Sequence, residues 1–380
     1  MAYQLSEDQR LIQETARAFA RNELRPHAGR WDEGHEFPKA TIKSAAELGF
    51  GGIYVRDDVG GSGLGRLDAA LVFEELSRGC VTTAAFISIH NMAAWMIDTF
   101  GNEEQRQRWL PKLTSMELMA SYCLTEPGSG SDASALRTTA RADGNSHYIL
   151  NGTKAFISGA PENDLYVCMV RTGDPGPKGI STVVVEKGTP GLSFGAQERK
   201  MGWNAQPTAQ VIFEDCRIPV ENRLNDEGFG FKIAMAGLDG GRLNIAASSL
   251  GGATDALERA IGYAKERQAF GKPIGDFQAT QFKLADMATE LEAARALLYE
   301  AARRLDAKDP EATKFCAMAK RFVTDAGFRV ANEALQIHGG YGYLKDYEVE
   351  RIVRDVRVNQ ILEGTNEIMR VIIARELSRV

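Results

Sequence analysis

The chain has 380 residues, with 45 lysines and arginines against 51 aspartates and glutamates, and a formal net charge of -6. This acidic balance disfavours nucleic acid and anionic membranes as main partners, and the length allows two or three units with substantial cores. Its five cysteines form no C-x-x-C pair and its five histidines show no metal-ligand spacing, which favours a reducing compartment and no metal site.

The first zone, residues 1–115, is expected to form a helical domain. Ser6 and Gln9 have the spacing of a capping box, and Ala16 and Phe19 follow at helical intervals. The start lacks the basic segment and apolar run of a signal peptide, and no stretch has the length and apolarity of a membrane span. These features predict a protein without a targeting segment, located in a bacterial cytoplasm or, as a mature form, in the mitochondrial matrix.

The second zone, residues 116–225, changes to alternation with a period of two and has frequent turn residues. A hairpin is expected in which residues 147–150 and 153–157 are joined by a type I′ turn at Asn151-Gly152. Further β-branched or aromatic runs occur at residues 165–170, 180–185 and 209–213. This zone is predicted to be an antiparallel β domain.

The third zone, residues 226–380, returns to long helical patterns. Apolar residues at three- and four-residue steps predict a helix from Asp276 to Lys308. Gly339 and Gly340 are expected to end the helix that follows it. The order of the zones predicts an α+β fold, with an N-terminal helical domain, a middle antiparallel β domain and a C-terminal helical bundle.

Three segments have compositions suited to a binding or catalytic site. Residues 122–132 read YCLTEPGSGSD, residues 336–343 read QIHGGYGY, and residues 360–367 read QILEGTNE. Glycine-rich loops let backbone donors approach a ligand closely, although from composition alone each segment could be an ordinary turn or helix end. In the third segment Gly364 can end one helix and Thr365 can cap the next, so that Glu363 would project from a rigid junction.

These segments resemble the signatures of the acyl-CoA dehydrogenase family, and the likeness covers almost the whole chain. The resemblance implies an acyl-CoA dehydrogenase fold, FAD as cofactor and an acyl-CoA thioester as substrate. It also implies an electron-transferring flavoprotein as electron acceptor, and a homo-oligomer, expected to be a tetramer, in which FAD is shared between subunits.

The resemblance assigns the catalytic base to Glu363. Family members of the isovaleryl- and long-chain type carry the base on an earlier helix, just before the arginine that matches Arg242. Here that neighbour is Gly241, which cannot act as a base, so Glu363 is the predicted base. Closure of the site against water is expected to raise the pKa of Glu363 and make it a more effective base.

The other site residues are carried over from the family by matching positions. The implied FAD-binding residues are Tyr122, Leu124, Thr125, Gly130, Ser131, Phe156, Ile157, Ser158, Arg267, Phe277, Gln278, Gln336, Ile337, Gly339, Gly340, Thr365, Asn366 and Glu367. The implied substrate-binding residues are Ser131, Leu238, Asp239, Arg242, Gly364 and Arg375. Phe156 stands where many relatives have tryptophan but keeps a stacking surface. For Arg267 a solvated helix-end cation, and for Arg242 an internal salt bridge, are the alternatives.

Within the family, several segments are most similar to the branch that acts on isobutyryl-CoA. They are residues 88–92, 95–98, 156–160, 202–204 and 237–244. This likeness implies formation of methacrylyl-CoA in valine breakdown, although Asp239 and Leu243 stand where asparagine and isoleucine are expected. Butyryl-CoA and 2-methylbutyryl-CoA are alternative substrates, because one methylene contributes only about 1–3 kcal/mol to discrimination.

Two other functional classes occur on this scaffold. Flavin monooxygenases of this kind often lack the base that Glu363 would provide. A non-enzymatic relative is expected to show a damaged motif or a basic patch, and the sequence has neither feature.

Overall fold

The N-terminal helices begin where the sequence predicts a cap. In the computed structural model, which describes residues 5–378, Ser6 Oγ accepts the backbone N–H of Gln9 and Gln9 Oε1 accepts that of Ser6, both at 3.1 Å. The predicted capping box is therefore confirmed. The helices of this part are α1 (Glu7–Phe19), α2 (Ala28–Gly34), α3 (Lys39–Ala46), α4 (Arg66–Gly79), α5 (Val81–Phe100) and α6 (Glu103–Thr114), and a π-helical turn, Ala20–Leu24, extends α1.

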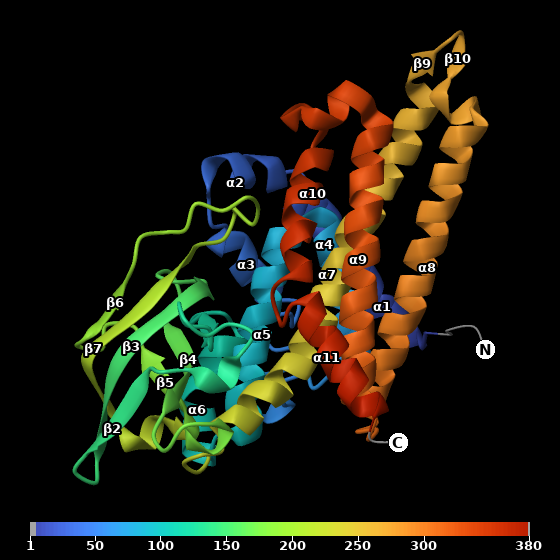
Figure 1. Cartoon of the computed structure of the whole chain (residues 1–380). Coiled ribbons are helices and arrows are strands. Elements are labelled where there is room, and N and C mark those ends of the chain that lie inside the picture. The colour runs from blue at the N-terminus through green and yellow to red at the C-terminus, as the bar shows by residue number, and fades with distance from the viewer. Residues whose placement is uncertain (1–4, 379–380) are drawn as a thin grey trace.

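The middle of the chain forms one eight-stranded sheet, seen beside the helices in Figure 1. Its strands are β1 (Ala120–Cys123), β2 (Thr139–Asp143), β3 (His147–Ser158), β4 (Leu165–Arg171), β5 (Ile180–Glu186), β6 (Leu192–Phe194), β7 (Thr208–Pro219) and β8 (Arg223–Leu224). The order is β6-β7-β3-β2-β4-β5-β8, with β1 paired to β4. Most pairings are antiparallel, while β1 runs parallel to β4 and β2 makes a single parallel pairing with β4.

The expected hairpin at Asn151-Gly152 is wrong, because both residues lie inside the continuous strand β3. Pairing with β7 extends along both halves of β3, with a register shift between Leu150 and Gly152. Gly152 has a φ of +141°, and a Cβ there would lie 2.6 Å from Thr138 Oγ1. The glycine therefore permits a bulge and a close contact rather than a turn.

The C-terminal part is a bundle built around the 37-residue helix α7 (Gly230–Glu266). At 1.5 Å per residue α7 is about 55 Å long, and it ends at the small hairpin of β9 (Gln268–Ala269) and β10 (Lys272–Pro273). The other helices are α8 (Gln278–Asp306), α9 (Ala312–His338), α10 (Val349–Arg357) and α11 (Asn366–Leu377). The predicted helix over Asp276–Lys308 is confirmed as α8, and α9 ends at Gly339, whose φ is +60°.

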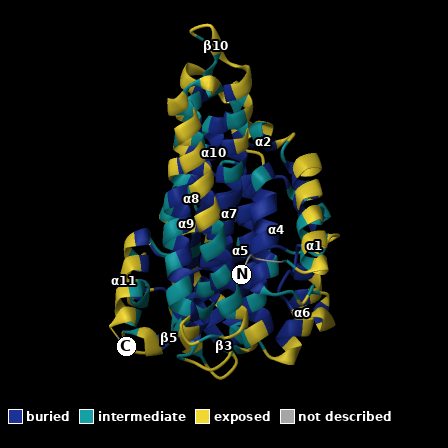
Figure 2. Cartoon of the chain, turned by 90° about the vertical axis from the view of Figure 1, so that its right-hand side faces the viewer, coloured by how far each residue is buried: buried dark blue, intermediate teal, exposed yellow. Residues whose placement is uncertain are grey.

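The helices at the two ends of the chain share one core. A single cluster of buried apolar side chains takes members from α1, α4, α5, α7, α8, α9 and α10. Figure 2 shows α4, α5 and α7 buried at the centre of the bundle, with exposed residues at the β9–β10 tip and along the outer face of α11. Within residues 5–378, no helix has the length and apolarity needed to cross a membrane.

Candidate active site

Glu363 lies on a tight turn that leads into α11. Its φ is +56° and that of Gly364 is +88°, so two consecutive residues adopt the left-handed conformation. A residue with a Cβ is strained there and needs support from its surroundings. Thr365 then caps α11, because its Oγ1 accepts the backbone N–H of Ile368 at 3.3 Å. The predicted cap is confirmed, and it fixes the turn against the start of the helix.

One oxygen of the Glu363 carboxyl group is closed to water. The residue as a whole is only partly buried, yet its Oε2 is inaccessible and has no hydrogen-bond partner among the described residues. Burial raises the pKa of Glu363 to about 7, although the positive charges of Arg242 and Lys320 act to lower it. The predicted rise is confirmed, and its main cause is desolvation of the carboxylate.

Helix α7 approaches this carboxyl group at Gly241. A Cβ at position 241 would lie 2.6 Å from Glu363 Oε2 and 3.0 Å from the Sδ of Met92. The space in which a side chain at 241 would begin is therefore occupied by the Glu363 carboxyl group. A side chain at 241 would therefore force the Glu363 carboxyl group or the Met92 thioether to shift, and glycine leaves room for both.

One turn of α7 carries a salt bridge beside Glu363. Arg242 Nη1 lies 2.6 Å from Asp239 Oδ1, and Thr313 Oγ1 on α9 donates to Asp239 Oδ2 at 2.7 Å. Arg242 Nε also donates to the carbonyl oxygen of Glu363 at 3.4 Å. The structure thus contains the internal salt bridge, which holds the guanidinium beside Glu363. Leu238, on the same face, belongs to an apolar cluster that includes Met92.

The end of β1 brings the first glycine-rich segment to the same place. The hydroxyl group of Tyr122 is buried without a hydrogen-bond partner among the described residues, and burial, together with the negative charge of Glu363, raises its pKa. Leu124 points into the apolar core, so only its backbone is available to a ligand. Thr125 accepts the backbone N–H of Ala155 at 2.8 Å, which fixes the loop to β3.

A buried ion pair lies under this loop. Lys154 Nζ, whose side chain is fully buried, lies 2.8 Å from Glu126 Oε1 and 3.2 Å from the carbonyl oxygen of Leu124. Glu126 also accepts the backbone N–H groups of Arg137 and Thr138 at 2.6 and 2.8 Å. Gly130 and Ser131 remain exposed at the tip of the loop, where a Cβ on Gly130 would meet nothing within 4 Å.

Phe156 projects outward from β3. Its φ is +59°, and the pairing of β3 with β7 shifts register between Lys154 and Ile157. This irregularity leaves 66% of Phe156 exposed, whereas the side chain of Ile157 is buried in the sheet. Ser158 Oγ accepts a hydrogen bond from the side chain of Gln206 at 3.4 Å. The irregular strand therefore presents an exposed aromatic ring on its surface.

Seven of the predicted FAD residues lie at the far end of the bundle, namely Arg267, Phe277, Gln278, Gln336, Ile337, Gly339 and Gly340. A cavity of about 420 Å³ there is lined by Tyr263, Arg267, Ile274, Ile337, His338, Gly339, Gly340, Tyr341 and Leu344. Phe277, Gln278 and Gln336 belong to the neighbouring ends of α8 and α9, near the β9–β10 hairpin (Figure 1). Arg267 and Arg242 are separated by most of α7, roughly 38 Å along the helix. The structure does not bring these residues together with Glu363 within one chain.

Three predicted residues on α11 have different surroundings. The side chain of Asn366 is buried and bonds to Lys320, Thr324 and Asp325 on α9. Glu367 is exposed, and Arg375 contacts Glu376 at 3.3 Å on the outer end of the helix.

The structure adds site residues that sequence analysis did not identify. Lys320 lies behind the Glu363 turn, and Met92 faces Gly241. The guanidinium carbon of Arg66 lies 3.8 Å from the centre of the Tyr54 ring. Met92 falls within a segment singled out by resemblance. Nothing local in the sequence distinguishes Lys320 from a solvated lysine of an amphipathic helix, because its burial depends on packing between α9 and the turn.

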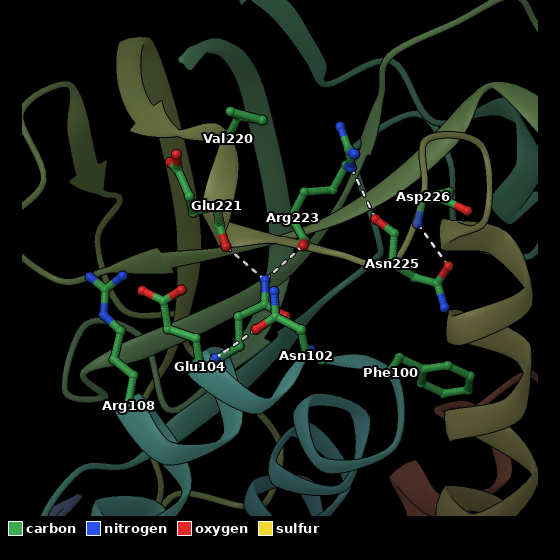
Figure 3. A pocket seen from close by; sticks show the side chains of 11 residues that line it. Phe100, Asn102, Glu104, Arg108, Val220, Glu221, Arg223, Asn225 and Asp226 are labelled. Atoms are coloured by element: carbon green, nitrogen blue, oxygen red, sulfur yellow. Dashed lines mark hydrogen bonds between the residues drawn. The ribbon is translucent and has the colours of Figure 1, made fainter. Parts of the chain in front are cut away.

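A second cavity, of about 390 Å³, lies elsewhere, between the start of α6 and the segment around β8 (Figure 3). Its polar groups bond to one another, since Gln105 Nε2 donates to the carbonyl oxygens of Glu221 and Arg223 at 2.7 and 2.8 Å. None of the predicted site residues lines it.

Comparison with known proteins gives consistent matches along the chain. Family models for the N-terminal, middle and C-terminal domains of acyl-CoA dehydrogenases match residues 6–117, 121–216 and 228–378. The chain is 58% identical to mitochondrial isobutyryl-CoA dehydrogenase of Bos taurus, over 98% of this chain and 89% of that protein. It is 45% identical to the mitochondrial short-chain specific acyl-CoA dehydrogenase of the same species, over 98% and 91%.

A solved structure shows the same fold. Butyryl-CoA dehydrogenase from Megasphaera elsdenii superposes with a TM-score of 0.97 at 39% identity, covering 100% of both chains. Three family models that together span most of the chain, and relatives of this identity over nearly their full length, establish the relationship. The chain belongs to the FAD-dependent acyl-CoA dehydrogenase family and is an oxidoreductase of that family.

Proposed function

We propose that the chain oxidises isobutyryl-CoA to methacrylyl-CoA, a step of valine breakdown, with Glu363 as the base that removes the α-proton. The observation that carries this proposal is the buried, unpartnered Oε2 of Glu363, whose pKa is raised to about 7. A base with this pKa is half ionised near neutral pH and gains driving force for proton abstraction. The 58% identical isobutyryl-CoA dehydrogenase of Bos taurus supports the choice of substrate.

The turn that carries Glu363 also offers a donor for the thioester. The backbone N–H of Glu363 donates no hydrogen bond to another described residue. In the proposed reaction it donates to the thioester carbonyl oxygen and stabilises the negative charge that develops when the α-proton leaves. Arg242, held by Asp239, orders the acyl-CoA beside the base.

The residues of the chain fit FAD in two groups. The first group comprises Tyr122, Leu124, Thr125, Gly130, Ser131, Phe156, Ile157, Ser158, Thr365, Asn366 and Glu367. The orphaned Tyr122 hydroxyl group and the exposed Phe156 ring support a planar, polar-edged ligand here. When bound, FAD accepts the hydride from the β-carbon of the substrate.

The second group comprises Arg267, Phe277, Gln278, Gln336, Ile337, Gly339 and Gly340, around the cavity at the end of the bundle. A Cβ on Gly339 or Gly340 would meet nothing within 4 Å, so a ligand can approach the backbone there. Because this group lies roughly 38 Å along α7 from Arg242, we assign it to the FAD of a neighbouring subunit in a homotetramer. Arg267 would then balance the charge of the pyrophosphate.

The wider setting of the enzyme follows from the family resemblance. Electrons would pass to an electron-transferring flavoprotein, in a bacterial cytoplasm or a mitochondrial matrix. Ser131, Leu238, Gly364 and Arg375 would complete the acyl-CoA contacts.

A short straight-chain substrate is the second candidate. The 45% identical short-chain specific relative and the butyryl-CoA dehydrogenase structure favour it. The test is anaerobic mixing of purified protein with isobutyryl-CoA while flavin absorbance is followed, together with kcat/KM for isobutyryl-, 2-methylbutyryl- and butyryl-CoA. We expect isobutyryl-CoA to bleach the flavin rapidly and to give the highest kcat/KM of the three substrates. A clear preference for butyryl-CoA would contradict the branched-chain assignment, and no bleaching with any of the three would contradict the proposed reaction.

A further inference from the structure

A buried lysine lies directly behind the turn that carries Glu363. Lys320, on α9, is 0% exposed. Its Nζ donates to the carbonyl oxygen of Gly364 and to Asn366 Oδ1, both at 2.8 Å, and makes no ion pair within residues 5–378. Burial lowers the pKa of Lys320 to about 7. A positive charge here is costly, because the amine is buried and bonds only to a backbone carbonyl oxygen and an amide, and Lys320 carries that charge below about pH 7.

The turn itself needs such a support. Glu363 and Gly364 are both left-handed, and the strain at Glu363 persists only if neighbouring groups hold the backbone in place. Helix α9 holds the turn on its other sides as well. Asp325 Oδ1 accepts from Gln360 Nε2 at 2.8 Å, before the turn, and from Asn366 Nδ2 at 2.7 Å, after it.

The charge of Lys320 also reaches the base. The groups that act on Lys320 are Glu363, Arg242, Asp325 and Glu367. Those that act on Glu363 are Arg242 from α7 and Lys320 from α9, while Tyr122 from β1 and Tyr54 also face it. The positive charge of Lys320 lowers the pKa of Glu363 and opposes the effect of burial.

We propose that Lys320 is a positioning residue for the base: it fastens the left-handed Glu363-Gly364 turn to α9 and keeps a positive charge behind the Glu363 carboxylate. The inference rests on the proposed function of Glu363 and goes beyond it. Two roles follow for one side chain. The hydrogen bond to Gly364 holds the carboxyl group in its place beside α7, and the charge keeps part of the carboxylate ionised at neutral pH despite burial.

The experiment measures single-turnover bleaching of the holoenzyme by saturating isobutyryl-CoA as a function of pH. Lys320→Met removes the charge and the donors while keeping an extended side chain, and Lys320→Gln removes the charge but keeps a neutral donor. Lys314→Met is the matched control, because Lys314 lies on the same helix and pairs with Glu311. FAD content and Tm are recorded for each variant, and Lys320→Gln is the test variant if Lys320→Met does not retain FAD.

The rate is expected to rise with pH as Glu363 ionises. Lys320 is charged below about pH 7, and there it lowers the pKa of Glu363. Without that charge the rise begins at higher pH in both Lys320 variants, and each unit of movement lowers the rate on the acid side about tenfold. Lys320→Met also lowers the plateau rate at high pH, because the turn loses its hydrogen bond from position 320 to the carbonyl oxygen of Gly364. Lys314→Met leaves the profile of the wild type.

A variant that retains FAD but keeps the wild-type profile would overturn the inference, even if its Tm falls, because a purely structural lysine changes stability alone. Failure of the proposed function would show separately. In that case the wild-type protein would not bleach, or Glu363→Gln would bleach as fast as the wild type.

Discussion

At the scale of single residues, the environment of Glu363 is set by burial and by close packing. Its Oε2 faces Gly241 on α7, and Lys320 on α9 approaches the turn from behind. Resemblance pointed to Glu363, and the expected burial of its carboxyl group predicted the direction of its pKa shift. The left-handed conformation, the role of Gly241 as the space for the carboxyl group and the presence of Lys320 could not be predicted, because they arise from contacts between segments far apart in the sequence.

The raised pKa of Glu363 predicts how stability depends on pH. The folded-state pKa is about 7 against an ordinary value of 4.5, so the folded protein keeps a proton that the unfolded chain has released. The contribution of this group to stability is therefore complete below pH 4.5 and is lost as the pH rises through about 7. Glu363→Gln has no carboxyl group to titrate at this position and therefore no such loss. Each unit of pKa shift corresponds to about 1.4 kcal/mol in the free energy of unfolding.

The measurement is the Tm of wild type and Glu363→Gln between pH 5 and 8, the range set by this pKa. The variant is expected to gain Tm relative to the wild type as pH rises. A Tm difference that does not change with pH would show that the carboxyl group of Glu363 titrates as an exposed one.

At the scale of elements, local sequence patterns predicted a strand or helix correctly where only one structural signal was present. The strands β4, β5 and β7, the helix α8 and the end of α9 were each predicted from alternation, helical spacing or a glycine stop. The hairpin at Asn151-Gly152 was wrong because pairing of β3 with β7 along both halves of the strand outweighed the local turn signal. The outward orientation of Phe156 could not be predicted from the sequence either, because it depends on a register shift between two strands.

The buried ion pair of Lys154 and Glu126 carries a prediction about the loop that follows β1. Lys154→Met would leave Glu126 as an uncompensated buried charge, at a cost of about 3–5 kcal/mol in the free energy of unfolding. The exposed pair of Lys39 and Glu162 provides the control, because Lys39→Met is expected to cost less than about 1 kcal/mol. Urea denaturation of both variants measures the two values, and similar losses would contradict the structural role assigned to the buried pair.

At the scale of the whole molecule, the predicted FAD residues fall into two groups, one around β1, β3 and the Glu363 turn and one at the far end of the bundle. Motif spacing in the sequence could not reveal this separation, because the long helix α7 runs between the groups. Family resemblance supplied the idea of a cofactor shared between subunits, and the position of the second group at the far end of the bundle supports that idea.

This arrangement predicts that FAD binding and subunit assembly are linked. The mass of the FAD-bound protein, measured by sedimentation, is expected to be that of several chains of 41.6 kDa each. Arg267→Ala is expected to lose FAD, although Arg267 lies roughly 38 Å along α7 from Arg242 in its own chain. Analytical ultracentrifugation with detection at the flavin absorbance measures both quantities. A monomer with one full equivalent of FAD would exclude the shared site.

The central claim is that the carboxylate of Glu363 removes the α-proton. The most direct test is single-turnover bleaching of FAD-loaded Glu363→Gln by isobutyryl-CoA under anaerobic conditions, with binding of the acyl-CoA measured in parallel. We expect the variant to retain FAD and to bind isobutyryl-CoA, while its flavin bleaches at least about 10²-fold more slowly than that of the wild type. Bleaching at a rate near that of the wild type would contradict it.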